Sequence, residues 1–170
     1  NSRALSYLFI VEPINLVSVT VTDERYRTIA NQTFFGARNL SELNLPKGIT
    51  SVGIRAFEGC ESLKTIDFID SVDYIGSYAF ARSGIENFTV PDAVSMINEG
   101  TFEDCLKLRW VKIGENVNTI RENAFNGCMY LHEIYNNNRI SNSELEKLTY
   151  VLKVYEPNEQ PVPKVISGGF

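Results

Sequence analysis

The side chains that most often carry out chemistry are scarce in this sequence. Its 170 residues include one histidine, His132, and three cysteines, Cys60, Cys105 and Cys128. Nucleophilic catalysis needs a Ser or Cys held beside a general base, and no such motif here pairs with His132. We therefore interpret His132 as a solvent-facing residue, and we predict no catalytic residue and no enzyme activity for this chain.

The cysteines have two other possible roles, as a disulfide or as metal ligands. All three stand in one column of the repeat described below, and Cys105 and Cys128 belong to adjacent copies, within the Cα range that a disulfide spans. The odd number of cysteines, and the exchange of the column with Ala37 and Ser83, favour small buried thiols over a bridge. A metal site is disfavoured because close-spaced ligand pairs are missing, so no metal or other cofactor is expected.

Acidic residues gather only at Asp67, Asp70 and Asp73. Their spacing lacks the glycine and the terminal glutamate of a calcium-binding loop. We predict a solvated loop here, with a weak calcium site as the second alternative.

The overall charge excludes some partners. A net charge of -5 and a pI near 5.0 argue against nucleic acid, which is bound through clustered Lys and Arg. The first apolar run, residues 4–11, is too short to span a bilayer, so no membrane insertion is expected within this chain.

An internal repeat determines which structural elements position these residues. Phenylalanine recurs at intervals of 23, 23, 22 and 23 residues, at Phe34, Phe57, Phe80, Phe102 and Phe125. The aligned unit reads L-x-x-L-x-L-P-x-x-V-x-x-I-G-x-x-A-F-x-G-C, most fully over residues 40–62. Columns that are fixed in type but variable in identity are typical of packing, so each copy is expected to form one coil of a stack.

The spacing within the unit predicts the shape of a coil. The L-x-L step has a period of two, which fits a short strand with alternate side chains inward. A second extended segment is expected to end at Gly53 and Gly76, and a helical turn or tight corner at A-F-x-G-C. Coils about 4.8 Å apart would pair their strands and share one core. The interval of 22 places a one-residue deletion near Ser83 and Gly84, in a loop.

The unit resembles the BspA-like leucine-rich repeats of bacterial surface antigens, which are also abundant in some parasitic protists. Residues 40–62, 63–84, 85–107 and 108–130 carry the resemblance, and Ile69 and Gly114 depart from its proline column. We predict a leucine-rich-repeat right-handed solenoid, mostly β, with short parallel strands. The resemblance implies a secreted or cell-surface protein with a role in adhesion or host interaction.

The ends of the stack are expected to differ from its middle, because terminal coils need caps. Residues 1–16 are predicted to form an N-terminal cap or irregular strand, and residues 17–136 the repeats. Ser143 and Glu146 have the form of a capping box, which predicts a C-terminal capping helix over 137–154. Residues 155–170, rich in proline, are predicted to be a tail or linker.

The outward side of the first strand is the predicted binding surface. Its only tryptophan, Trp110, lies in a row that is otherwise polar, and aromatic residues are enriched at binding hot spots. The alternative is that Trp110 only packs on its cross-strand neighbours. The residues that we predict to contact a ligand are Trp110, Lys112, Tyr135, Arg109 and Asp67.

These observations predict a non-catalytic interaction module that binds a protein or, alternatively, a glycan. We expect it to be extracellular or on the cell surface, with any signal peptide outside this chain. An intracellular scaffold or regulatory leucine-rich-repeat domain is the alternative.

Overall fold

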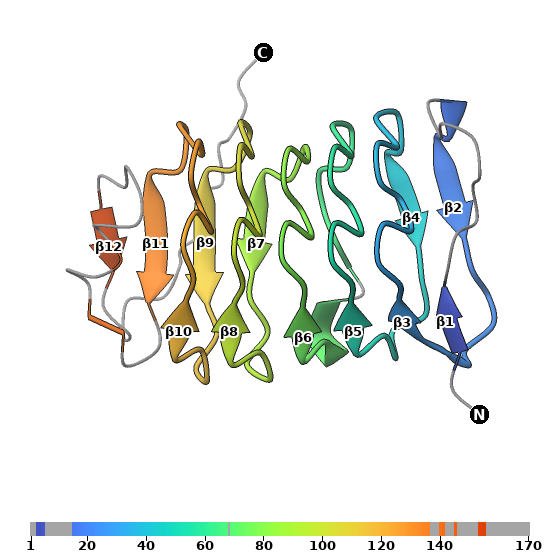
Figure 1. Ribbon diagram of the computed structural model, residues 1–170, viewed down its shortest axis with the longest axis horizontal. Helices are drawn as coiled ribbons and strands as arrows, with labels where there is room; N and C mark the ends of the chain where they lie inside the picture. Colours follow the sequence, from blue (N-terminus) through green and yellow to red (C-terminus); the bar gives the residue numbers. More distant parts are fainter. Residues whose placement is uncertain are drawn as a thin grey trace, which may run out of the picture.

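The computed structural model is a stack of coils whose short strands all pair in parallel (Figure 1). It describes residues 3–5, 15–67, 69–136, 140–141, 145 and 153–155. The strands are β1 (Arg3–Leu5), β2 (Ser18–Thr20), β3 (Tyr26–Ile29), β4 (Glu42–Asn44), β5 (Ser51–Val52), β6 (Tyr74–Ile75), β7 (Asn87–Thr89), β8 (Met96–Ile97), β9 (Trp110–Ile113), β10 (Thr119–Ile120), β11 (Glu133–Asn136) and β12 (Lys153–Tyr155). A 3-10 helix, η2, spans Ile69–Ser71.

The short strands lie on two sides of the stack. The first side holds the sheets β2–β4 and β7–β9–β11–β12, and the second holds β1–β3–β5–β6 and β8–β10. The strands of the first side come from the L-x-L step, and β5 and β6 of the second side end directly before Gly53 and Gly76, where an extended segment was predicted. The third side is closed by turns around the recurring phenylalanine. A mostly-β parallel solenoid is thereby confirmed.

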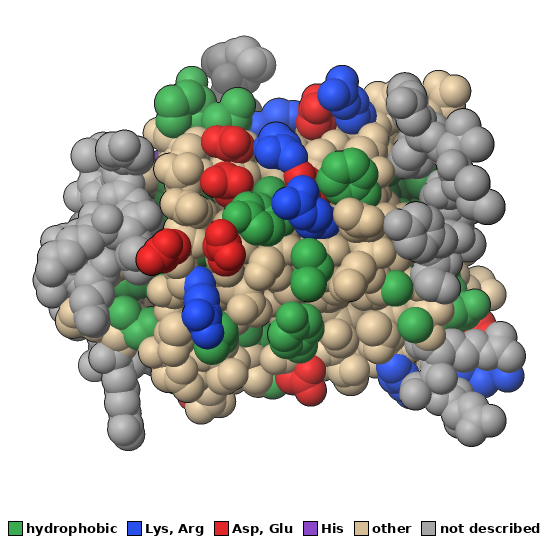
Figure 2. Space-filling model, viewed as in Figure 1, with side chains coloured by type: hydrophobic (Ala, Val, Ile, Leu, Met, Phe, Trp, Pro, Cys, Tyr) green, Lys and Arg blue, Asp and Glu red, His purple; other side chains and the backbone are tan. Residues whose placement is uncertain are grey.

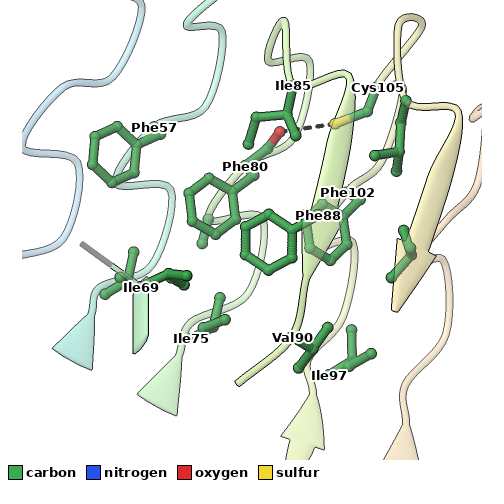
Figure 3. Packing of buried hydrophobic residues seen from close by; sticks show 14 of the residues in the cluster. Phe57, Ile69, Ile75, Phe80, Ile85, Phe88, Val90, Ile97, Phe102 and Cys105 are labelled. Carbon is green, nitrogen blue, oxygen red and sulfur yellow. Dashed lines mark hydrogen bonds between the residues drawn. The ribbon is translucent and has the colours of Figure 1, made fainter. Parts of the chain in front are cut away.

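The five recurring phenylalanines form a file through the middle of the stack. Neighbouring rings lie 5.1–5.8 Å apart between centroids, with interplanar angles of 4–17°. Phe88, from β7, adds a sixth ring, 5.2 Å from Phe80 and 4.8 Å from Phe102. Figure 3 shows four of these rings, Phe57, Phe80, Phe88 and Phe102, packed among other buried apolar residues of the core. The core is therefore one continuous apolar spine.

The column of small residues lies directly beside this file. Each cysteine thiol donates a hydrogen bond to the carbonyl of the phenylalanine in the preceding coil (Figure 3 shows one of these). The three pairs, 2.9–3.2 Å apart, are Cys60–Phe34, Cys105–Phe80 and Cys128–Phe102. The column therefore requires small size, as the buried Ala37 shows, and its cysteines also satisfy a backbone carbonyl of the preceding coil.

Two backbone positions with positive φ flank every phenylalanine of the file. The first series is Gln32, Arg55, Tyr78, Gly100 and Asn123, with φ of 55–59°. The second is Gly36, Gly59, Arg82, Asp104 and Gly127, with φ of 53–76°. Left-handed conformation at these two places turns the chain around the phenylalanine, and only four of the ten residues are glycine. The coil geometry is therefore kept even where the residue type disfavours it.

The predicted one-residue deletion lies between Phe80 and Ile85, in the corner that leads to β7. The other corners place a two-residue turn there, and this one has only Gly84 after Ser83. A Cβ atom on Gly84 would lie 2.1 Å from the backbone oxygen of Glu61. The shortened corner is tolerated because glycine lets the two backbones approach this closely.

The coil from Leu63 departs from the prediction of one outward strand per copy. No strand forms at residues 64–67, and η2 follows instead, with Ile69 buried where Pro46 and Pro91 stand in neighbouring coils. The first side of the stack is consequently divided into two sheets.

The predicted C-terminal capping helix is wrong for its last residues. Lys153 and Val154 belong to β12, which pairs with β11 in the register Glu133 to Lys153. A segment that places β-branched Val154 beside the unpaired edge of β11 gains ladder hydrogen bonds that a helix would not provide. Of residues 142–150 only Leu145, which is buried, is described, so the predicted capping box lies outside the described residues.

Candidate binding surface

The outward sides of β7, β9 and β11 form one continuous surface, which we call the strand face. Trp110 lies at its centre, because its backbone pairs with Asn87 on one side and Glu133 on the other. The inward residues of the same strands are buried in the core, so the outward ones alone are available for contact. The residues of the strand face are Asn87, Thr89, Trp110, Lys112, Glu133 and Tyr135.

Trp110 and Tyr135 lie in one patch, as predicted. Their rings also contact each other, as in the alternative interpretation of Trp110. The rings meet edge to face, 6.0 Å apart with an interplanar angle of 86°, and Trp110 is half-buried. The Tyr135 hydroxyl donates to a carboxylate oxygen of Glu133 at 2.9 Å. This contact is a cross-strand pair that also presents the remaining indole surface to solvent.

Tyr135 is not the exposed contact residue that the repeat alignment predicted. Only 7% of it is exposed. The reason is the additional strand: β11 lies between β9 and β12, so Tyr135 is in the interior of the sheet and not at its end. Trp110 therefore carries most of the accessible aromatic surface of this pair.

The two predicted cations lie on either side of Trp110. Arg109 is exposed immediately before β9, and its carbonyl accepts from the backbone N–H groups of His132 and Glu133. Lys112 is half-buried on β9, level with Thr89. Among the described residues neither cation is paired with a carboxylate, in contrast to Lys64, which lies 3.5 Å from Glu86.

Asp67 is separated from the rest of the predicted site. It is an exposed residue of the coil that lacks an outward strand, and β7 stands between it and β9. Asp70 and Asp73 are exposed in the same coil. No three His, Cys, Asp or Glu side chains of the described part of the chain are grouped so that they would hold a metal ion.

The histidine is exposed to solvent, whereas the three thiols are buried. His132 is exposed, with Nδ1 2.8 Å from the Tyr130 carbonyl. The three cysteines are free and buried. Burial raises the pKa of the Cys60 thiol from 9.0 to about 12. The hydrogen bond with Cys105, and then burial, raise the pKa of the Cys128 thiol. Protonated, enclosed thiols of this kind are poor nucleophiles.

We expect a thiol-reactive reagent at neutral pH to modify none of the three cysteines in the folded chain and all three after unfolding. Cys60 should also make stability sensitive to alkaline pH. Its folded pKa is above the unfolded value, so its contribution is full below pH 9 and is lost as pH rises towards 12. Denaturation at neutral and alkaline pH checks this, with Cys60→Ala as the control that lacks the effect. Rapid labelling of the folded protein at neutral pH would contradict the expected protection of the three thiols.

The structure contains a charged cluster on the turn side that the sequence did not predict. Glu58, only 2% exposed, forms ion pairs with Arg55, at 3.1 Å, and with Arg82. Arg55 also lies over the Tyr78 ring, 4.9 Å from its centroid, and the Tyr78 hydroxyl donates to Glu99 at 2.8 Å. Figure 2 shows this face, where basic and acidic side chains lie side by side. Glu58 occupies a variable column, so the repeat pattern contained no signal for it.

The described residues contain no helix that is long and apolar enough to cross a membrane. Stacked coils of parallel strands around a file of apolar side chains define the class as a leucine-rich-repeat solenoid. The chain belongs to the BspA type leucine rich repeat family, whose repeat region matches residues 7–150 in six copies.

Solved structures of bacterial leucine-rich-repeat proteins share this fold. The Treponema protein (T. pallidum TpLRR) has a TM-score of 0.64 and 24% identity over 70% of this chain and 58% of its own. A leucine rich cell surface protein of Faecalibacterium prausnitzii A2-165 has a TM-score of 0.60 and 24% identity, over 73% and 40%. The pneumococcal vaccine antigen PcpA has a TM-score of 0.59 and 22% identity, over 74% and 31%. This chain therefore spans less than two thirds of each of them. No curated protein sequence matches it significantly.

Proposed function

We propose that this chain is a protein-interaction module that binds its partner through the strand face. The observation that carries the proposal is the position of Trp110, which contacts Tyr135 at the centre of the parallel sheet and is flanked by Arg109 and Lys112, two cations that form no ion pair with a described carboxylate. A rigid aromatic with charged neighbours is the typical composition of a binding hot spot. Membership of the leucine-rich-repeat family supports a role in protein binding.

The proposed location is the cell surface or the extracellular space. The support is that two structurally similar proteins are a cell surface protein and a vaccine antigen. Adhesion to, or interaction with, a host is the corresponding proposed role, and a protein is the proposed ligand. An antibody raised against the chain should label intact cells of the source organism if this is right, and only permeabilised cells if it is wrong.

Replacing Trp110 with alanine is expected to weaken partner binding by about 2 kcal/mol, roughly thirtyfold, because a central hot-spot aromatic is lost. The cost to stability should be about 1 kcal/mol, the value of one aromatic pair. Binding is measured by surface plasmon resonance on proteins retained by the immobilised chain from a panel of purified cell-surface and matrix proteins.

The matched control is Tyr74→Ala, because Tyr74 is also an exposed aromatic on a strand but lies in β6, on the second side of the stack. It should leave binding unchanged. An equal loss of binding affinity in both variants, or unfolding of the Trp110 variant, would contradict the assignment of the strand face as the binding surface.

A further inference from the structure

Three exposed apolar side chains lie together at the corner that leads into β9 and β11. Leu106 is 51% exposed, Met129 67% and Tyr130 64%. Leu106 and Met129 occupy equivalent positions of adjacent coils, one residue after the cysteine column, so they lie side by side. Figure 2 shows hydrophobic side chains at the upper edge over these coils. We call Leu106, Met129 and Tyr130 the corner patch.

The fold does not require apolar residues at this corner. The equivalent positions of earlier coils hold Arg38 with Asn39 and Glu61 with Ser62, and those corners have the same two-residue turn. The backbone bonds that close the corner are likewise the same, such as Leu63 N to Cys60 O in one coil. The apolar surface is therefore a feature of the last two coils alone, and contiguous exposed patches of this kind mark interaction sites.

The corner patch has Asp104 beside it on the turn side, next to Gly127, and cations towards the strand face, on a chain whose net charge is -5. Lys107 lies within the corner, where its Nζ donates to the Glu61 carbonyl at 3.1 Å, and no carboxylate of the described residues forms an ion pair with it. Arg109 follows two residues later and leads directly to Trp110 on the strand face. The nearest acidic side chain on β11, Glu133, accepts the hydrogen bond of Tyr135.

We propose that the corner patch and the adjoining strand face bind an acidic segment of a partner protein that carries apolar side chains. The apolar side chains would cover the corner patch, and the carboxylates would lie against Lys107, Arg109 and Lys112. Charge complementarity selects this partner on the strand side of the corner patch, because Lys107, Arg109 and Lys112 would attract carboxylates there and repel a basic segment. This inference rests on the proposed function and specifies its partner.

The test is selection of random peptides displayed on phage against the immobilised chain. The selected peptides are expected to be enriched in Asp and Glu together with Leu, Phe or Trp, and their binding should weaken as salt is added. Met129→Ser combined with Tyr130→Ser should weaken binding about tenfold, and Arg109→Glu by at least as much. Matched controls are Phe35→Ser, an exposed apolar residue of another face, and Lys47→Glu, an exposed cation elsewhere.

The outcomes separate this inference from the proposed function. Peptides that lose binding with Trp110→Ala but not with the corner-patch or Arg109 variants would overturn the inference and leave the proposed function standing. Peptides insensitive to all of these variants, or the absence of any selected peptide, would count against both. Displacement of the peptides by single-stranded DNA, or self-association of the chain that the Met129 and Tyr130 changes abolish, would assign the surface to a different occupant.

Discussion

Replacing Phe80 with alanine is expected to lower the free energy of unfolding by about 3–5 kcal/mol. Phe80 is fully buried and contacts three rings, those of Phe57, Phe102 and Phe88, at centroid distances of 5.2–5.8 Å. Its neighbours are held by a ladder on both sides, so they would not collapse into the space left behind. In a stack stabilised by nearest neighbours, a cavity at the middle coil also weakens the link between the two halves.

Urea unfolding followed by circular dichroism measures the change, and a broadened or two-step transition would show that the halves have become separable. Phe35→Ala is the matched control, because Phe35 is a phenylalanine of the same array whose ring is exposed. It should change stability by less than about 1 kcal/mol. Similar losses in the two variants would contradict the view that the file of rings is the main source of stability.

The second large effect is expected at the shortened corner. Gly84→Ala would place Cβ 2.1 Å from the Glu61 oxygen and 3.2 Å from the Leu63 oxygen, both of which are backbone atoms of the preceding coil. Backbone cannot rotate away as a side chain can, so the coils must separate locally. We expect a loss of about 3 kcal/mol, at the upper end of the cost of overpacking.

Gly36→Ala is the control that separates steric overlap from backbone conformation. Gly36 has φ of +73° and no atom within 4 Å of an added Cβ, so alanine there carries only the left-handed penalty of about 1 kcal/mol. Thermal unfolding of both variants is the measurement. An equal, small effect at the two positions would show that the corner at Gly84 is more adaptable than its contacts indicate.

The spine of the molecule was predictable because packing imposes residue type. A position that must fill the same space in every coil keeps its apolar character, as Phe57 and Phe102 do at intervals close to 23. The hydrogen bond made by Cys105 was not predictable, because spacing alone reveals the size of a column and not the direction of its donors.

The strand face was predictable in position and only partly in exposure. Alternation placed Trp110 and Tyr135 outward, and their contact follows from that register. The burial of Tyr135 depends on β12, which comes from a segment outside the repeat and therefore had no pattern to align. The prediction for Asp67 was wrong because its coil forms no outward strand and has η2 over Ile69–Ser71 instead.

The cluster around Glu58 illustrates a third limit. Its partners Arg55 and Arg82 occupy the two left-handed columns, where the repeat alignment shows no preference for charge. An ion pair between variable positions of adjacent coils leaves no periodic trace, so only coordinates reveal it.

The two left-handed positions of each coil have a consequence for how such an array changes over generations. Arginine, aspartate and tyrosine adopt at these positions nearly the same backbone angles as glycine, with φ of 53–57° at Arg82, Asp104 and Tyr78. The bend is therefore a property of the whole loop and is inherited intact when a copy is duplicated or when its surface residues are exchanged. Lengthening by whole units and diversification of the outer side chains are consequently independent routes by which such an array acquires new partners.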